Sequence, residues 1–114
     1  MHAFAVLADP VRRSIVKNLI GQPLSSGEIV ETVGEEFGIS QSAVSQQLKV
    51  LRENGFATVA VDGNRRIYSL DSEGFEQIDE WLGPFRRFWE PKFEALAKEV
   101  ARGKRSKKKV DPTH

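Results

Sequence analysis

Hydrophobic residues near the N-terminus recur every three or four positions, the spacing of helices with one buried face. Residues 2–8 are mostly apolar and predict a brief first helix. Asp9 and Pro10 then predict a second start, because Asp caps free backbone N–H groups and proline suits the first helical position. The second helix should end at Gly21 and bury four aliphatic residues: Val11, Ile15, Leu19 and Ile20.

A third helix is predicted from Ser25 onward. Ser25 and Glu28 have the spacing of a capping box, in which each side chain accepts the other residue's backbone N–H. This helix should end near Val33, and its buried side should consist of Ile29, Val30 and Val33.

A turn at residues 38–40 should lead into a fourth helix. Ser40 is a suitable N-cap for this helix, and Gly55 can take the left-handed conformation that ends it. Its inward side steps by four and three residues through Val44, Leu48 and Leu51.

The pattern changes to that of strands after Gly55. Residues 56–61 and 65–70 are rich in β-branched and aromatic side chains, and the Asp-Gly between them is typical of a hairpin turn. Helical spacing then returns, with Pro84 and Pro91 expected to bend the last helix or divide it in two. The predicted fold is mainly α with a small β-hairpin (α+β), in the order α-α-α-α-β-β-α with a long or kinked C-terminal helical segment.

The composition excludes several kinds of site. The absence of cysteine excludes disulfides, thiolate metal sites and a cysteine nucleophile. The two histidines, His2 and His114, lie at opposite ends of the chain, so we expect neither a metal nor a cofactor. No apolar run approaches the roughly 20 residues that span a bilayer, and no signal peptide is evident; we expect a cytoplasmic protein. An enzyme is disfavoured, because the serines lack an internal histidine to activate them.

Charge is unevenly distributed along the chain. Residues 1–101 carry 11 Lys and Arg against 15 Asp and Glu, a net charge of −4, whereas residues 102–114 carry six Lys and Arg and one Asp. This C-terminal segment is equally consistent with a solvated, disordered tail and with a nucleic-acid contact. Within the acidic body, residues 38–70 have a net charge of +2, so a nucleic-acid site would be local to them.

Two helices joined by a short turn and followed at once by a hairpin form the winged helix-turn-helix arrangement. There the second helix, here residues 41–54, enters the major groove of DNA. Its outward side is rich in serine and glutamine, which bind base edges, and no acidic residue occurs from Phe37 to Arg52. Adjacent strand residues face opposite ways, so one hairpin arginine should meet DNA while the other packs or pairs internally. The predicted DNA-binding residues are Ser40, Gln41, Ser42, Ser45, Gln46, Lys49, Arg52, Asn64, Arg65 and Arg66.

Two other interpretations of this surface stay open. The first is that this side of the helix is simply solvated and contacts no ligand. That interpretation does not explain why acidic residues are missing from it. A winged-helix protein–protein interaction module without sequence-specific DNA binding is the alternative function. A partner-docking helix would be expected to expose an aromatic or aliphatic anchor, and the outward positions of this helix offer none.

Four stretches resemble ArsR-type winged-helix repressors of prokaryotes: DPVRRSIVKNL, SQSAVSQQLKVLRENGF, DGNRRIYSLD and WLGPFRRFWEPKFEAL. The resemblance spans residues 3–101. It implies a homodimer that binds a pseudo-palindromic operator and represses transcription, with hairpin residues 62–66 on the DNA backbone or minor groove. Residues 1–101 would form the DNA-binding and dimerisation domain, and residues 102–114 a basic, disordered tail. The implied dimer interface lies on the first and last helices, at Phe4, Leu7, Trp81, Phe85, Phe88, Trp89 and Phe93.

Two departures from the family pattern matter. Gln47 occupies a position where relatives often have histidine; it lies near the buried edge of its helix, so we expect only a small change in backbone contact. Metal-sensing relatives carry a Cys-containing motif where this chain has residues 25–27, and others use Asp and His on the last helix. The resemblance therefore favours the cysteine-free branch that does not sense metal, with any small-molecule effector unknown.

Overall fold

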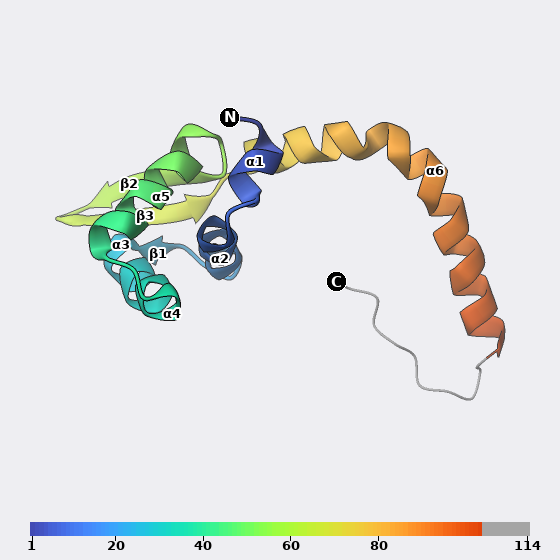
Figure 1. The fold of residues 1–114 in the computed structure, drawn as a ribbon, viewed down its shortest axis with the longest axis horizontal. Coiled ribbons are helices and arrows are strands. Elements are labelled where there is room, and N and C mark those ends of the chain that lie inside the picture. The colour runs from blue at the N-terminus through green and yellow to red at the C-terminus, as the bar shows by residue number, and fades with distance from the viewer. Residues whose placement is uncertain (104–114) are drawn as a thin grey trace. The chain divides into compact units, whose positions relative to one another are not determined.

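The computed structural model describes residues 1–103 in two compact units, one of residues 1–80 and one that begins at Trp81. The order of elements confirms a mainly helical fold with a hairpin (Figure 1). The elements are α1 (Ala3–Leu7), α2 (Pro10–Leu19), β1 (Leu24–Ser25), α3 (Ser26–Ile29), η1 (Val30–Gly34), α4 (Glu35–Phe37), α5 (Gln41–Glu53), β2 (Ala57–Asp62), β3 (Arg65–Leu70) and α6 (Glu73–Gly103).

The first two helices start as their sequences predict. The Asp9 carboxylate accepts the backbone N–H groups of Val11 and Arg12, and Pro10 occupies the first helical position. Ile15 and Leu19 are buried as expected, but the prediction for Ile20 was wrong, since 76% of this residue is exposed. The helix ends at Leu19, so helical spacing no longer turns Ile20 toward the core.

The helix that begins at Ser25 is longer than its sequence predicts. The capping box is present, with the Glu28 carboxylate accepting from Ser25 N–H and the Ser25 hydroxyl from Glu28 N–H. Instead of ending near Val33, the chain continues through the π-helical turn η1 and then α4, so it stops only at Gly38. Gly38 has a φ of 63°, a left-handed conformation that glycine adopts without strain.

The fourth predicted helix is confirmed as α5. Ser40 caps it by accepting the backbone N–H of Ala43, and Gly55 follows it with a φ of 79°. One side is fully buried in the core, and the residues on that side are Val44, Leu48 and Leu51.

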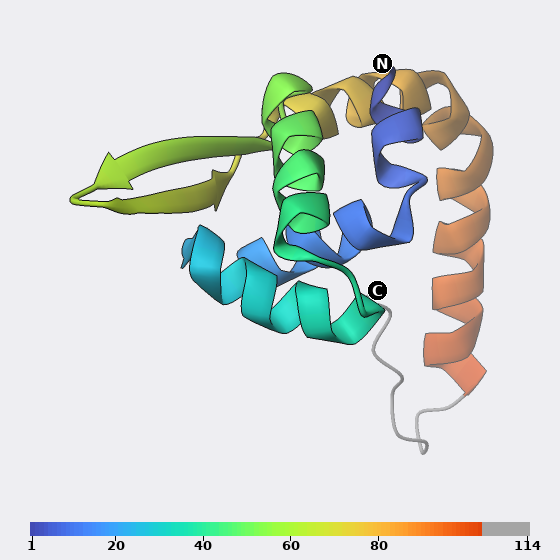
Figure 2. The same ribbon diagram turned by 60° about the vertical axis from the view of Figure 1, so that its left-hand side comes forward.

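The hairpin of β2 and β3 is confirmed and is part of a larger sheet. The short strand β1, which sequence analysis missed, pairs with β3 and gives the order β1-β3-β2, all antiparallel. Gly63, with a φ of 67°, lies in the turn between β2 and β3. Figure 2 shows this hairpin projecting beyond the helices, with α5 beside its base. We call the hairpin, residues 57–70, the wing.

Phe56 joins α5, the sheet and the start of α6 into one core. It is fully buried, and its ring meets that of Phe75 edge-on at 5.0 Å. Gly74 is required here, because a Cβ at this position would lie 2.6 Å from the Phe56 ring. The first turns of α6 are thereby fixed to the N-terminal unit.

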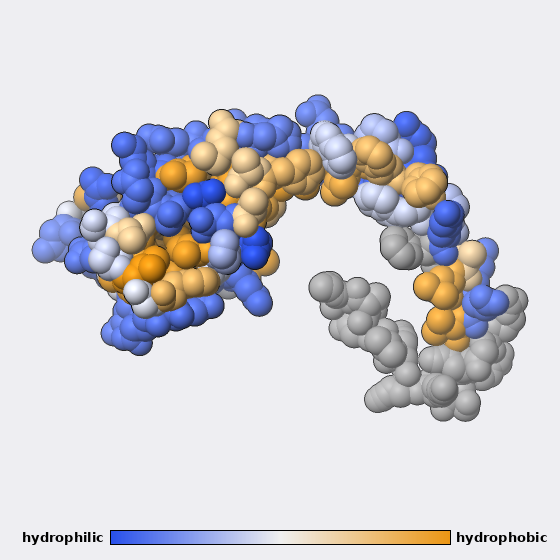
Figure 3. All heavy atoms as spheres, in the orientation of Figure 1, coloured by the Kyte–Doolittle hydropathy of each residue, from blue (hydrophilic) through white to orange (hydrophobic). Residues whose placement is uncertain are grey.

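The unit that begins at Trp81 consists of the remainder of α6. Pro84 and Pro91 do not divide this helix, which continues from Glu73 to Gly103. Both prolines are exposed, so water can hydrate the carbonyls that lose their donors. Five large apolar side chains of this segment are exposed: Trp81, Phe85, Phe88, Leu96 and Val100. Figure 3 shows hydrophobic residues at the surface along α6. No helix within residues 1–103 is long and apolar enough to cross a membrane.

Candidate nucleic-acid interface

The predicted DNA-contacting side chains of the fourth helix are all exposed on α5 or at its N-cap. Burial of Val44, Leu48 and Leu51 on the opposite side fixes which way they point. The Ser40 hydroxyl already accepts the Ala43 N–H at 3.1 Å, so it acts first as a cap. We call the other six side chains the reading face: Gln41, Ser42, Ser45, Gln46, Lys49 and Arg52.

The wing presents two exposed arginines on opposite faces. Arg66 lies directly across from Val61, and Arg65 lies across from Asp62. Because strand residues alternate, Arg66 shares a face with Tyr68, which is buried in the same core as α5. Arg66 is therefore the arginine on the α5 side of the sheet. Neither arginine is buried, so neither packs internally. The other half of the expectation, internal pairing, fits Arg65, which lies across from Asp62 and acts on the charge of Glu28.

Glu28 is the second acidic neighbour of Arg65. The pKa of its carboxyl is lowered, first by the backbone N–H of Ser25 at 2.8 Å and then by the Ser25 side chain. The positive charge of Arg65 lowers this pKa further. Arg65 therefore acts on the carboxylate of Glu28 and has Asp62 as its cross-strand neighbour, whereas Arg66 faces an aliphatic side chain.

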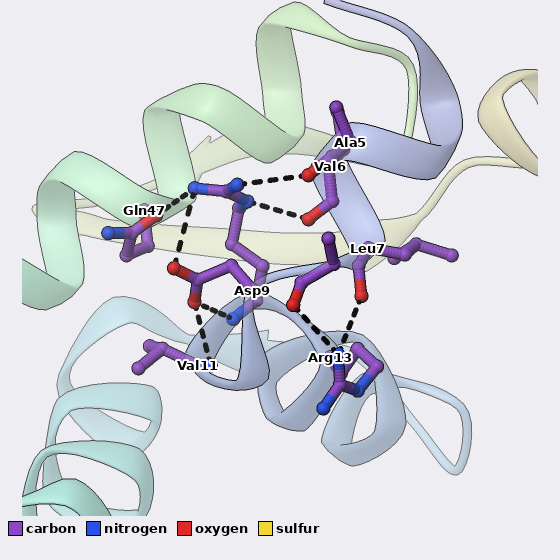
Figure 4. Close-up of polar contacts among 9 residues, drawn as sticks. Ala5, Val6, Leu7, Asp9, Val11, Arg13 and Gln47 are labelled. Atoms are coloured by element: carbon purple, nitrogen blue, oxygen red, sulfur yellow. Dashed lines mark hydrogen bonds and ion pairs between the residues drawn. The ribbon is translucent and has the colours of Figure 1, made fainter.

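A half-buried arginine joins α1, α2 and α5, a connection that sequence analysis missed (Figure 4). The Arg12 guanidinium donates from Nε to the Val6 carbonyl at 2.7 Å, from Nη2 to the Ala5 carbonyl at 3.3 Å, and from Nη1 to Gln47 Oε1 at 2.7 Å. Its Nη1 also lies 3.9 Å from Asp9 Oδ2. Local sequence patterns do not reveal this contact, because 35 residues separate Arg12 from Gln47.

Neighbouring Arg13 completes the attachment of α1. Its Nη1 donates to the carbonyls of Leu7 at 2.9 Å and Ala8 at 3.0 Å. Two guanidinium groups therefore satisfy the carbonyls at the end of a five-residue helix, which is too short to be stable alone.

The predicted dimer residues divide between the two units. Phe4 is exposed and Leu7 half-buried on α1. On α6 the rings of Trp81 and Phe85 stack at 4.6 Å, and Lys92 Nζ lies 4.6 Å from the centre of the Phe88 ring. Trp89 is half-buried, and the side chain of Phe93 lies outside the described residues. Residues 104–114 of the predicted tail also lie outside them.

Comparison with known proteins assigns the family. A family model described as a helix-turn-helix domain matches residues 7–60. The HTH-type transcriptional regulator Rv2034 of Mycobacterium tuberculosis is 38% identical over 87 residues, which cover 76% of this chain and 75% of that protein. The chain belongs to the ArsR-type family of helix-turn-helix transcriptional regulators. Members of this family bind DNA and are not enzymes.

Solved structures of the ArsR-type family share this fold. A possible transcriptional regulator for arsenical resistance is 31% identical, with a TM-score of 0.61 over 87% of this chain and 96% of that one. The ArsR family regulator RHA00566 is 24% identical, with a TM-score of 0.65 over 77% of this chain and 87% of that one, a likeness in fold alone. Within residues 1–103, no three His, Cys, Asp or Glu side chains form a group that could hold a metal ion.

Proposed function

We propose that this ArsR-type regulator is a homodimeric repressor that binds a pseudo-palindromic operator, with α5 in the major groove and the wing on the backbone or minor groove. The observation that carries the proposal is the composition of the reading face. Four uncharged hydrogen-bonding side chains and two cations share one exposed side of a helix whose other side is fixed in the core. Occupation of an operator within a promoter would block transcription.

The side chains of the reading face suit different parts of DNA. Gln41 and Gln46 have the paired acceptor and donor that match the edge of adenine, and Ser42 and Ser45 can serve several bases. Lys49 and Arg52 come later in the helix and are assigned to phosphates. Base contacts by the first half of the helix follow the usual docking of helix-turn-helix proteins.

Apolar surface on α1 and α6 supports a dimer. Phe4 is 41% exposed on α1, and Phe88 is 68% exposed on α6. Large exposed apolar patches mark interaction surfaces. A symmetric dimer would present two copies of α5 to half-sites about 10 base pairs, or one helical turn, apart.

The alternative, a protein-docking module, is less well supported by the same face. A docking helix needs a buried aromatic or aliphatic anchor to supply most of the affinity. All six members of the reading face are polar, and no acidic residue lies among them. A surface without anchors and without acids is better suited to DNA.

Selection of bound duplexes from a random pool tests the proposal. We expect enrichment of a palindrome with half-site centres about 10–10.5 base pairs apart. Gln46→Ala should relax the preference at one base pair per half-site, at a cost of roughly 1–3 kcal/mol for the preferred base. Lys17→Ala, a change to an exposed α2 cation outside the reading face, is the control and should leave the motif intact. A pool without an enriched palindrome would favour the protein-docking alternative.

A further inference from the structure

Arg12 connects α1, which carries predicted dimer residues, to the helix that carries the reading face. Its Nε donates to the Val6 carbonyl at 2.7 Å and its Nη2 to the Ala5 carbonyl at 3.3 Å, and both carbonyls belong to α1. Its Nη1 donates to Gln47 Oε1 on α5 at 2.7 Å (Figure 4). One guanidinium therefore binds the backbone of α1 and a side chain of α5 at the same time.

Gln47 meets this guanidinium on the side of α5 that lies away from the reading face. At about 3.6 residues per turn, Gln47 lies almost half a turn around the helix from the middle of the reading face. It is half-buried, next to the core side of the helix. The bond to Arg12 therefore holds α5 from behind, while the six side chains of the reading face point the other way.

The contacts of Arg12 add direction to packing that is otherwise apolar. Val6 of α1 and Leu48 of α5 are buried in the same core, but apolar burial is non-directional. The planar guanidinium instead donates along fixed directions to acceptors on both helices. If either helix moved about 1 Å away from Arg12, its 2.7 Å contact would lengthen beyond hydrogen-bonding range. Arg12 thus restricts the position of α5 relative to α1.

Arg12 itself has little freedom to follow such a movement. Its side chain is only 13% exposed, and its Nη1 also lies 3.9 Å from Asp9 Oδ2. The other oxygen of this carboxylate accepts the backbone N–H groups of Val11 and Arg12, which fixes Asp9 at the start of α2. The guanidinium is therefore anchored to α2 while it bridges α1 and α5.

We propose that Arg12, acting through Gln47, is a positioning residue that restricts the operator to one half-site spacing. This inference rests on the proposed function, a homodimer that binds a palindrome. Phe4 is 41% exposed on α1 and is a predicted dimer residue, so α1 would have a fixed place relative to the two-fold axis. A helix fixed to α1 then presents its reading face at a set distance from that axis, and symmetry sets the distance between the two copies.

Operators with altered spacing test this inference. One base pair added between the half-sites moves the second half-site about 3.4 Å along and about 34° around the duplex axis. In the wild type, this addition should lower affinity by a factor of about ten or more, because base contacts in one half-site are lost. Gln47→Leu removes the acceptor, so α5 can follow the displaced half-site and the penalty should shrink by a factor of about three or more. The preferred half-site sequence should stay the same.

Fluorescence anisotropy with the selected palindrome and with its lengthened form measures the penalty as a ratio of two affinities. Each protein is assayed below its melting temperature and above its dimer dissociation constant, so a general loss of stability cancels in this ratio. Gln47→Glu keeps an acceptor for Arg12 and should keep the wild-type penalty. Gln22→Leu, the matched change at an exposed residue outside α5 and the wing, should keep it too.

Removal of Arg12 tests the same link from its other end. Arg12→Met should reduce the penalty as Gln47→Leu does, and the double variant should reduce it no further, because both changes break one contact. A Gln47→Leu protein with the full wild-type penalty or a changed half-site sequence would overturn the inference, as would a wild type that tolerates the added base pair. In those cases the proposed function stands, whereas a wild type that binds no palindrome would overturn the proposed function itself.

Discussion

Replacing Arg66 with alanine should weaken DNA binding more than replacing Arg65, although the two residues are adjacent and exposed. Their cross-strand partners differ, since Arg66 faces Val61 and Arg65 faces Asp62. Arg65 also acts on Glu28, whose lowered pKa reflects in part this positive charge. Arg66 therefore has its charge available for phosphate on the α5 side of the wing.

The expected magnitude follows from counterion release. Each lost phosphate contact reduces the magnitude of the slope of log affinity against log salt by about 0.9. Over a fourfold increase in salt concentration, the affinity of such a variant should therefore fall by a factor roughly 3.5 times smaller than that of the wild type. Arg66→Ala should show this full change. Arg65→Ala should show less than about half of it, because a cation that already interacts with the Glu28 carboxylate and lies across from Asp62 displaces fewer counterions from DNA.

Fluorescence anisotropy with a labelled operator, read at several salt concentrations, measures these slopes for the wild type and both variants. A duplex of scrambled sequence shows whether the loss is uniform, as a phosphate contact requires. Lys17→Ala controls for the loss of any surface cation. Equal slope changes for the two arginines would refute the assignment of the wing faces, and unchanged slopes would remove the wing from the interface.

Two further predictions concern the dimer and the capping box. Phe88→Glu should raise the dimer dissociation constant by a factor of about 30 or more, which is a loss of about 2 kcal/mol or more of dimerisation free energy. Sedimentation at micromolar concentration measures this constant. The control Ile20→Glu places the same carboxylate at an exposed aliphatic residue, the C-cap of α2, and should leave the dissociation constant unchanged. Because the pKa of Glu28 is lowered in the folded chain, its carboxylate stabilises the fold above its unfolded pKa and loses this effect as pH falls through the folded value. Glu28→Gln should therefore lower the melting temperature at pH 7 and reduce the loss of stability on acidification. If the melting temperatures of the wild type and the variant changed with pH in parallel, this prediction would be contradicted.

Local signals in the sequence predicted most of the fold, because each needs only neighbouring residues. Asp9, Ser25 and Ser40 cap the helices that follow them, and the bonds that they accept are present in the structure. Gly55 takes the positive φ that its position predicted, and Gly63 lies in the predicted hairpin turn. Burial on α5 also followed its helical spacing, so the direction of the reading face could be assigned before the structure was known.

Features that depend on distant parts of the chain were not predictable in this way. Strand β1 has two residues and exists because Leu24 and Ser25 pair with β3, more than 40 positions later. The Arg12–Gln47 contact joins segments 35 residues apart, and neither residue shows it in its local pattern. The DNA contacts and the dimer interface remain predictions, since their partners are other molecules.

The structure gives α5 three distinct sides, and these bear on the absence of acidic residues before Glu53, the last residue of the helix. The first side is buried in the core, and the second is the exposed reading face. The third holds Gln47 against Arg12, whose guanidinium also binds the end of α1. A helix that only met water could use Glu and Lys pairs for solubility. Here a carboxylate on the reading face would repel phosphate, so neutral hydrogen-bonding groups and cations suit that exposed side.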